Sequence, residues 1–217
     1  MNEGSVVRTL VFVGVIAAAA ALLVTSSHEF SKDRIAANER AKLMRSLFSV
    51  LDPAMLEEDL NPILLNATDD LLGSAKPVDV FVVIDDGRPV AAIFASIAPE
   101  GYNAPIQLLI GIDPGGEITG VRAVSHRETP GLGDEIDIAK SNWIKQFDGK
   151  SLGDPPIAGW AVKQDEGQFD SITGATVTPR AVIKAVKNTL LYFSEHKDEL
   201  FAAAGRVAAA GDDGTNE

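Results

Sequence analysis

The chain has 217 residues, of which 46% are apolar and 23% charged, so it suits one globular domain of ordinary size plus an appendage. Asp and Glu outnumber Lys and Arg by 31 to 19, and the formal charge of -12 argues against nucleic acid or anionic lipid as a partner held by charge. There is no cysteine, so the chain cannot itself supply a disulfide, a thiol nucleophile, a thiolate zinc site or a cysteine-ligated iron–sulfur cluster.

A long apolar run lies at the N-terminus. No charged side chain occurs between Arg8 and His28, and this length is close to the roughly 20 residues that a helix needs to cross a bilayer. A removed signal peptide is the alternative, but no convincing cleavage site follows the run. We therefore expect residues 1–27 to be a retained, single-pass membrane anchor.

The basic residues around this run favour one orientation. Arg8 precedes the run and is offset by Glu3, whereas five basic residues follow it: Lys32, Arg34, Arg40, Lys42 and Arg45. Because Lys and Arg are enriched on the cytoplasmic side of membrane spans, this pattern alone would place the rest of the chain in the cytoplasm.

Residues 28–75 read as a helical and acidic connecting segment. Residues 28–51 carry apolar residues at helical spacing and end at Asp52-Pro53, where a helix cannot easily continue. Residues 52–70 hold six acidic and no basic side chains, which predicts a solvated loop or short helix.

Residues 76–205 have the pattern of an α+β domain, in which an antiparallel sheet is flanked by helices. The expected elements, in chain order, are strands at 78–84, 89–96, 105–112 and 117–124, a helix at 134–147, a short strand at 160–163 and a helix at 178–204. Glycine-containing turns join the four longer strands into two hairpins. Thr178 is a plausible N-cap of the last helix, and residues 206–217 are expected to be a disordered acidic tail.

A loop rich in hydroxyl groups precedes that last helix. It reads DSITGATVT over residues 170–178, with hydroxyls at Ser171, Thr173, Thr176 and Thr178. Gly174 and Ala175 allow a close approach of the backbone, and the free amides of a helix N-terminus attract phosphate. The alternative is a capping loop whose Ser and Thr side chains satisfy their own backbone.

A second loop, HRETPGLG over residues 126–133, leaves the strand expected at 117–124. Pro130, Gly131 and Gly133 indicate a rigid turn with exposed amides, against which a flat ligand could lie with Leu132 on its face. The alternative is a structural connection, in which His126 is an ordinary surface or packed histidine.

Together, HRETPGLG and DSITGAT resemble the paired signatures of the FMN-binding domain of membrane redox complexes. Over nearly its whole length the chain resembles the G subunit of Rnf electron-transport complexes, called Rsx in some bacteria. The related C subunit of the sodium-pumping NADH:quinone reductase shares both motifs but is usually longer. A cofactor-free, membrane-tethered binding or assembly domain is the distant alternative.

The resemblance implies FMN held covalently through a phosphoester bond to Thr176, installed by a flavin transferase that uses FAD and Mg²⁺. The rest of the attachment motif is then Asp170, Ser171, Thr173, Gly174 and Ala175. The implied candidates for contacts with the flavin from the other loop are His126, Glu128, Thr129, Pro130, Gly131 and Leu132.

The resemblance also implies an electron carrier, without independent catalysis, in a complex that couples ferredoxin and NAD(H) redox chemistry to ion transport. Its partners would be the membrane and iron–sulfur subunits of that complex. The domain would lie on the periplasmic side of the inner membrane, opposite to the side that the basic residues favour. A dinucleotide fingerprint is missing from the sequence, so direct contact with NADH is not expected.

Overall fold

The computed structural model describes residues 12–14, 17, 41–52, 60 and 62–212, which belong to two compact units, Met1–Arg45 and Ser46–Glu217. Apart from residues 12–14 and 17, which are helical, the expected anchor lies outside the described residues. Within the described part of the chain, no helix is both long and apolar enough to cross a membrane. Of the helix expected over 28–51, residues 41–48 are helical and residues before 41 are not described.

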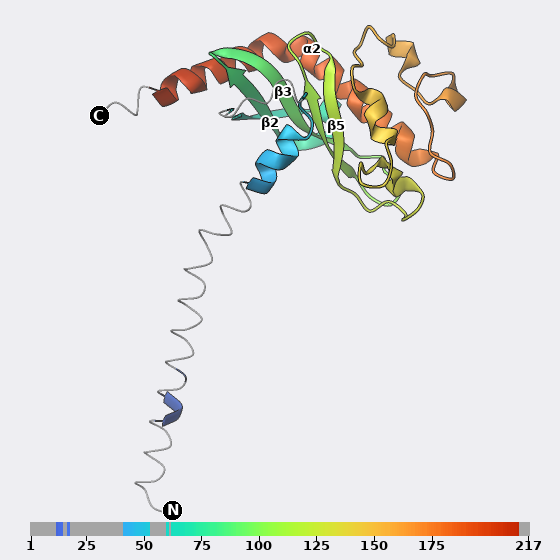
Figure 1. Ribbon diagram of the computed structural model, residues 1–217, viewed down its shortest axis with the longest axis horizontal. Helices are drawn as coiled ribbons and strands as arrows, with labels where there is room; N and C mark the ends of the chain where they lie inside the picture. The colour runs from blue at the N-terminus through green and yellow to red at the C-terminus, as the bar shows by residue number, and fades with distance from the viewer. Residues whose placement is uncertain (1–11, 15–16, 18–40, 53–59, 61, 213–217) are drawn as a thin grey trace, which may run out of the picture. The chain divides into compact units, whose positions relative to one another are not determined.

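The second unit contains a five-stranded antiparallel sheet whose strands follow the chain order β1-β2-β3-β4-β5 (Figure 1). The strands are β1 (Ile63–Asp69), β2 (Ser74–Asp85), β3 (Arg88–Ala98), β4 (Ile106–Ile112) and β5 (Ile118–Ser125). Both expected hairpins are confirmed. The β2–β3 turn places Asp86 and Gly87 at φ 45° and 73°, the left-handed backbone that an Asp-Gly turn supports.

The first strand corrects the expectation of a loop or short helix over 52–70. Residues 63–69 pair with β2, in a register that sets Leu65 opposite Val80. Side chains of β1 alternate between more and less exposed positions, as a half-buried edge strand requires. Leu64 is apolar but 54% exposed, so the sequence does not show the apolar–polar alternation that marks such a strand.

One face of the sheet is covered by the long helix α2 (Val177–Asp212), which lies across the strands (Figure 1). Phe94 of β3 packs edge-on against Tyr192 and Phe193 of α2, with ring centroids 6.0 and 6.1 Å apart. Edge-to-face pairs of this kind stabilise a core beyond their buried area. The helix is longer than predicted, so residues 206–212, expected in the disordered tail, are helical; residues 213–217 lie outside the described residues.

The opposite face of the sheet is covered in part by residues 47–51. The backbone of Val50 lies so close to the sheet that a Cβ on Gly120 would come within 3.0 Å of the Val50 Cα. The Thr119 hydroxyl donates a hydrogen bond of 2.6 Å to the Val50 carbonyl. Burial on both faces explains why β3 and β4 have nearly continuous apolar sequences.

The segment between β5 and α2 departs from prediction. The helix expected over 134–147 is wrong: two short 3₁₀ helices, η3 (Gly133–Ile136) and η4 (Trp143–Phe147), flank an extended Asp137 at φ -75° and ψ 127°. The carboxylate of Asp137 accepts a hydrogen bond from the Ala139 amide at 2.9 Å, a local bond that competes with a continuous helix.

The strand expected at 160–163 is also wrong. Val162 makes only an isolated bridge to Phe169. The stretch follows the 3₁₀ helix η5 (Ile157–Gly159) and runs into a second one, η6 (Lys163–Asp165). Aromatic packing holds the segment: Trp160 and Phe169 have centroids 4.8 Å apart, and Phe147 lies 5.0 Å from Phe169.

Candidate functional site

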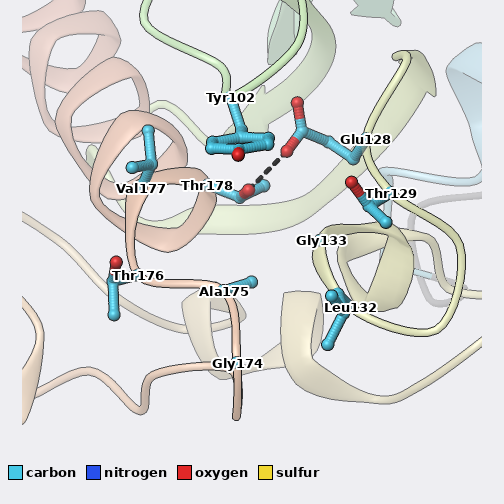
Figure 2. A pocket seen from close by; sticks show the side chains of 10 residues that line it. All are labelled: Tyr102, Glu128, Thr129, Leu132, Gly133, Gly174, Ala175, Thr176, Val177 and Thr178. Atoms are coloured by element: carbon cyan, nitrogen blue, oxygen red, sulfur yellow. Dashed lines mark hydrogen bonds between the residues drawn. The ribbon is translucent and has the colours of Figure 1, made fainter.

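The two loops singled out in the sequence meet at the N-terminus of α2 and enclose a cavity of about 330 Å³ (Figure 2). This volume falls within the range of roughly 300–1,000 Å³ that is typical of small-molecule sites. The described residues that line it are Tyr102, Glu128, Thr129, Leu132, Gly133, Gly174, Ala175, Thr176, Val177 and Thr178. A cavity of about 410 Å³ between β1 and α2 is larger but contains neither loop.

Glu128 lies at the centre of this arrangement and is only 5% exposed. Its Oε2 accepts a hydrogen bond from the Thr178 hydroxyl, and its Oε1 accepts one from the Asn103 amide at 3.4 Å. Figure 2 shows the carboxylate turned toward Tyr102 and Thr178. Glu128 therefore joins three segments: residues 101–104, its own loop and the first turn of α2.

Glycines make room for this carboxylate. A Cβ on Gly133 would lie 2.7 Å from Glu128 Oε2 and 2.8 Å from Thr178 Oγ1, and a Cβ on Gly101 would lie 3.2 Å from Glu128 Oε1. Real Cβ atoms essentially never come within 3.0 Å of such atoms, so a larger residue at position 133 would displace the Glu128 carboxylate or the Thr178 hydroxyl.

The loop of residues 126–133 is ordered by its own hydrogen bonds. The Thr129 carbonyl accepts from the Leu132 amide at 3.1 Å, and the Gly131 amide donates to the Asp134 carboxylate at 2.6 Å, with Gly131 at φ 76°. These contacts fix the turn that presents Leu132, 39% exposed, at the cavity.

The loop of residues 170–176 is fixed at its start through Asp170. Its carbonyl accepts from Trp143 Nε1 at 2.7 Å, its amide donates to Gln146 Oε1 at 2.7 Å, and its carboxylate pairs with Lys163 at 2.5 Å. Asp170 therefore positions the loop from outside the cavity lining, by contacts with η4 and η6.

The two loops touch at Gly174, which has φ 78°. A Cβ at this position would lie 2.8 Å from Leu132 Cδ2. Glycine suits this position because the backbone is left-handed, and a larger residue would in addition displace the Leu132 side chain.

Thr176 is exposed and immediately precedes the first residue of α2. The carbonyl of Thr176 accepts a 2.9 Å hydrogen bond from Arg180 one helical turn later. Arg180 also donates to both oxygens of Asp165, at 2.6 and 2.8 Å, and this contact lowers the pKa of Asp165.

Thr178 does not have the N-cap position that we expected. The helix begins at Val177, two residues before the start that an N-cap at Thr178 implies. Thr178 therefore lies within the first turn, and its buried hydroxyl donates a hydrogen bond to Glu128. Pro179 is compatible with this first turn because its missing amide hydrogen has no partner there.

The structure brings together six of the predicted residues at the cavity: Glu128, Thr129, Leu132, Gly174, Ala175 and Thr176. Six others lie outside the described lining: His126, Pro130, Gly131, Asp170, Ser171 and Thr173. His126 accepts from the Glu128 amide through Nδ1 at 3.3 Å, which makes it part of the turn.

Four lining residues were not predicted as site residues: Tyr102, Gly133, Val177 and Thr178. The sequence around Tyr102 could have indicated its role. Its aromatic side chain lies in a loop bounded by Gly101 and Pro105, where an exposed position is expected, and it is 67% exposed. The role of Thr178 depends on a partner 50 positions away and left no local signal.

Residues 101–191 match the family model described as FMN-binding domain, and this region contains both loops. The class that fold and site define is therefore an FMN-binding domain of α+β architecture with an antiparallel sheet. The matched range includes both loops of the cavity and Tyr102, so the family match covers the residues that line the cavity.

Curated relatives narrow the class. The G subunit of the ion-translocating oxidoreductase complex of Shewanella baltica is 43% identical over 183 residues, which cover 83% of this chain and 85% of that protein. The protein of the same name from Pseudomonas aeruginosa strain UCBPP-PA14 is 43% identical over 91% of this chain and 93% of its own length. That of Aliivibrio fischeri is 38% identical over 92% and 93%. The chain belongs to the family of G subunits of ion-translocating oxidoreductase complexes, and the resemblance drawn from the two motifs is confirmed.

Proposed function

We propose that this protein is the membrane-anchored flavoprotein subunit that passes electrons within an ion-translocating oxidoreductase complex, with FMN esterified to Thr176. One observation carries the proposal: the exposed Thr176 hydroxyl precedes the N-terminus of α2, at a cavity built from both motif loops. The FMN-binding family match and the names of the relatives support the same role.

The residues present fit a flavin and its phosphate. Gly174 leaves open the space beside Leu132 that a Cβ would fill, and amides at the start of α2 can donate to phosphate oxygens. Tyr102 and Leu132 supply exposed apolar surface on either side of the cavity for a flat ring.

Attachment would be a transfer from FAD catalysed by a separate flavin transferase. The Thr176 oxygen attacks the phosphorus on the riboflavin side of the pyrophosphate, the P–O bond to the adenylate half breaks, and AMP leaves. The hydroxyl proton goes to a base of the transferase, and no electrons change hands. An exposed acceptor is what such an external enzyme requires, and Thr176 is exposed.

When bound, FMN supplies the one- and two-electron chemistry, and the chain supplies position and surroundings. None of the ten described lining residues is Lys, Arg, His or Cys, and the Glu128 carboxylate is engaged by Thr178 and Asn103. The chain therefore orients the flavin, while proton exchange is left to solvent.

The proposed flavoprotein subunit lies at a membrane and has partner subunits. Residues 1–27 anchor the chain in the inner membrane, and the soluble domain faces the periplasm. The other membrane and iron–sulfur subunits of the complex are its partners. A reporter fused to the C-terminus tests the topology: activity of a periplasmic reporter supports this side, and activity of only a cytoplasmic reporter would place the domain where the basic residues favour.

The C subunit of a sodium-pumping NADH:quinone reductase would use the same chemistry in a different complex. The three relatives compared above carry the name of the G subunit, and they match over 85% or more of their own length, which favours the first assignment. Purification of the native complex separates the two, because only the first would bring iron–sulfur subunits that react with ferredoxin.

The covalent link is tested by in-gel fluorescence after denaturation of the chain co-produced with a flavin transferase. The wild-type band should fluoresce and Thr176→Ala should not. Thr173→Ala removes a nearby exposed hydroxyl outside the described lining, so it should weaken attachment and dim the band without abolishing its fluorescence. Fluorescence on denatured Thr176→Ala would show that another residue is the acceptor.

A further inference from the structure

Arg180 is held beside Thr176 by an acidic residue from a separate segment. Its Nε and one terminal nitrogen donate to the Asp165 carboxylate at 2.6 and 2.8 Å, and its other terminal nitrogen donates to the Thr176 carbonyl at 2.9 Å. Asp165 ends η6, after which Glu166 turns the chain with φ 61°. The guanidinium is therefore fixed from two sides next to the residue that would carry the flavin.

The contacts with Asp165 and Thr176 do not use all the N–H groups of the Arg180 guanidinium. A guanidinium has five N–H groups, and the three hydrogen bonds above use three of them, which leaves two of the five without a hydrogen-bond partner among the described residues. Arg180 follows Thr176 by four positions, so its side chain points back along the helix toward the first turn. The contact with the Thr176 carbonyl holds the guanidinium at the N-terminal end of α2, beside the residue proposed to carry the phosphate.

A phosphate at this end of α2 would find fewer backbone donors than at most helix N-termini. The first turn would normally offer four free amides, but Pro179 has none. None of the described lining residues carries a positive charge, and Lys163 is paired with Asp170. Among the described residues, Arg180 is thus the cation that contacts Thr176 directly, through its carbonyl.

We propose that Arg180 pairs with the phosphodiester that joins FMN to Thr176, and that Asp165 is the positioning residue that holds the guanidinium for it. This inference rests on the proposed attachment at Thr176. Arginine suits the task because its planar fork can serve a carboxylate on one edge and a phosphate oxygen on another, which an ammonium cannot do with the same geometry.

The test uses the full chain, produced with and without a flavin transferase, and three variants: Arg180→Gln, Arg180→Lys and Asp165→Asn. Lys184→Gln is the matched control, because Lys184 lies one turn further along α2 in an exposed ion pair with Glu100, at 2.5 Å. The measurements are the ³¹P chemical shift of the attached phosphodiester and the denaturant unfolding of the flavinylated and unmodified forms.

Arg180→Gln should move the ³¹P resonance and should raise the unfolding equilibrium constant about tenfold more in the flavinylated form than in the unmodified form. Arg180→Lys and Asp165→Asn should show intermediate shifts, and Lys184→Gln none. An unchanged ³¹P shift in Arg180→Gln, with equal destabilisation of both forms, would reduce the contact to a structural cap and overturn the inference. Wild-type protein without flavin on Thr176 by peptide mass would overturn the attachment site as well, so the two failures are distinguishable.

Discussion

The Thr178 hydroxyl donates a hydrogen bond to the Glu128 carboxylate, and both side chains are buried although 50 positions separate them. This contact ties the first turn of α2, which follows the proposed attachment residue, to the loop that presents Leu132. The distance between the two motif loops is therefore set by a polar pair inside the protein, before any flavin is present.

Replacing one member of this pair should destabilise the domain. Glu128→Ala leaves a buried hydroxyl without its acceptor and should lower the free energy of unfolding by about 1–3 kcal/mol, as measured by denaturant titration. Glu128→Gln keeps an acceptor oxygen and should cost less. Equal stability of the wild type and Glu128→Ala would show that the pair does not hold the loops together.

Replacing Gly174 should lower both the stability of the protein and the extent of flavin attachment. Gly174→Ala combines a left-handed backbone with a clash against Leu132, so it should destabilise the protein by more than about 1 kcal/mol and reduce flavin attachment. Gly116→Ala is the control, because Gly116 has φ 89° but nothing within 4 Å of its would-be Cβ. Similar losses in both variants would assign the effect to backbone strain alone.

Substitutions in the two loops should affect different properties of the flavin. Leu132→Asp places a charge at the cavity without touching the Thr176 hydroxyl, so flavin should still attach while its absorption spectrum and redox potential shift. Val207→Asp, at an exposed apolar residue far along α2, should change neither. A redox titration that gives the same potential for Leu132→Asp and the wild type would place this loop away from the ring.

The free energy of unfolding should decrease at acidic pH as Asp165 becomes protonated. Its pKa is lowered in the folded protein by the hydrogen bond from Arg180, so the ionised form contributes stability above the unfolded-state pKa of about 3.9, and this contribution is lost as pH falls through the lowered folded value. Asp165→Asn should flatten this part of the stability–pH curve, measured by thermal unfolding at several pH values. Parallel curves for the two proteins would contradict the ion pair.

The sheet and the long helix could be predicted because their signals are local. Glycine-containing turns mark both hairpins, and the apolar stripe through Ile183, Val186, Leu190 and Phe193 marks α2. The segment from 133 to 169 could not be predicted as well, because its apolar residues pack as an aromatic cluster joined by 3₁₀ turns and follow neither a helical nor a strand period.

The site was predictable at the level of its two loops and not at the level of each side chain. Thr176, Gly174 and Leu132 meet at the cavity as the motifs indicate. Glu128 was a candidate for contact with the flavin, but its two carboxylate oxygens accept hydrogen bonds from Thr178 and Asn103, which lie in other segments. Contacts between segments far apart in the chain leave no spacing pattern by which a sequence can reveal them.

The central claim is that Thr176 carries the flavin, and peptide mapping by mass spectrometry tests it most directly. The full wild-type chain, co-produced with a flavin transferase and digested, should yield one peptide heavier by one esterified FMN, with fragmentation placing the added mass on Thr176. Fragments that place it on Ser171, Thr173 or Thr178, or a chain that carries no added mass, would contradict the account.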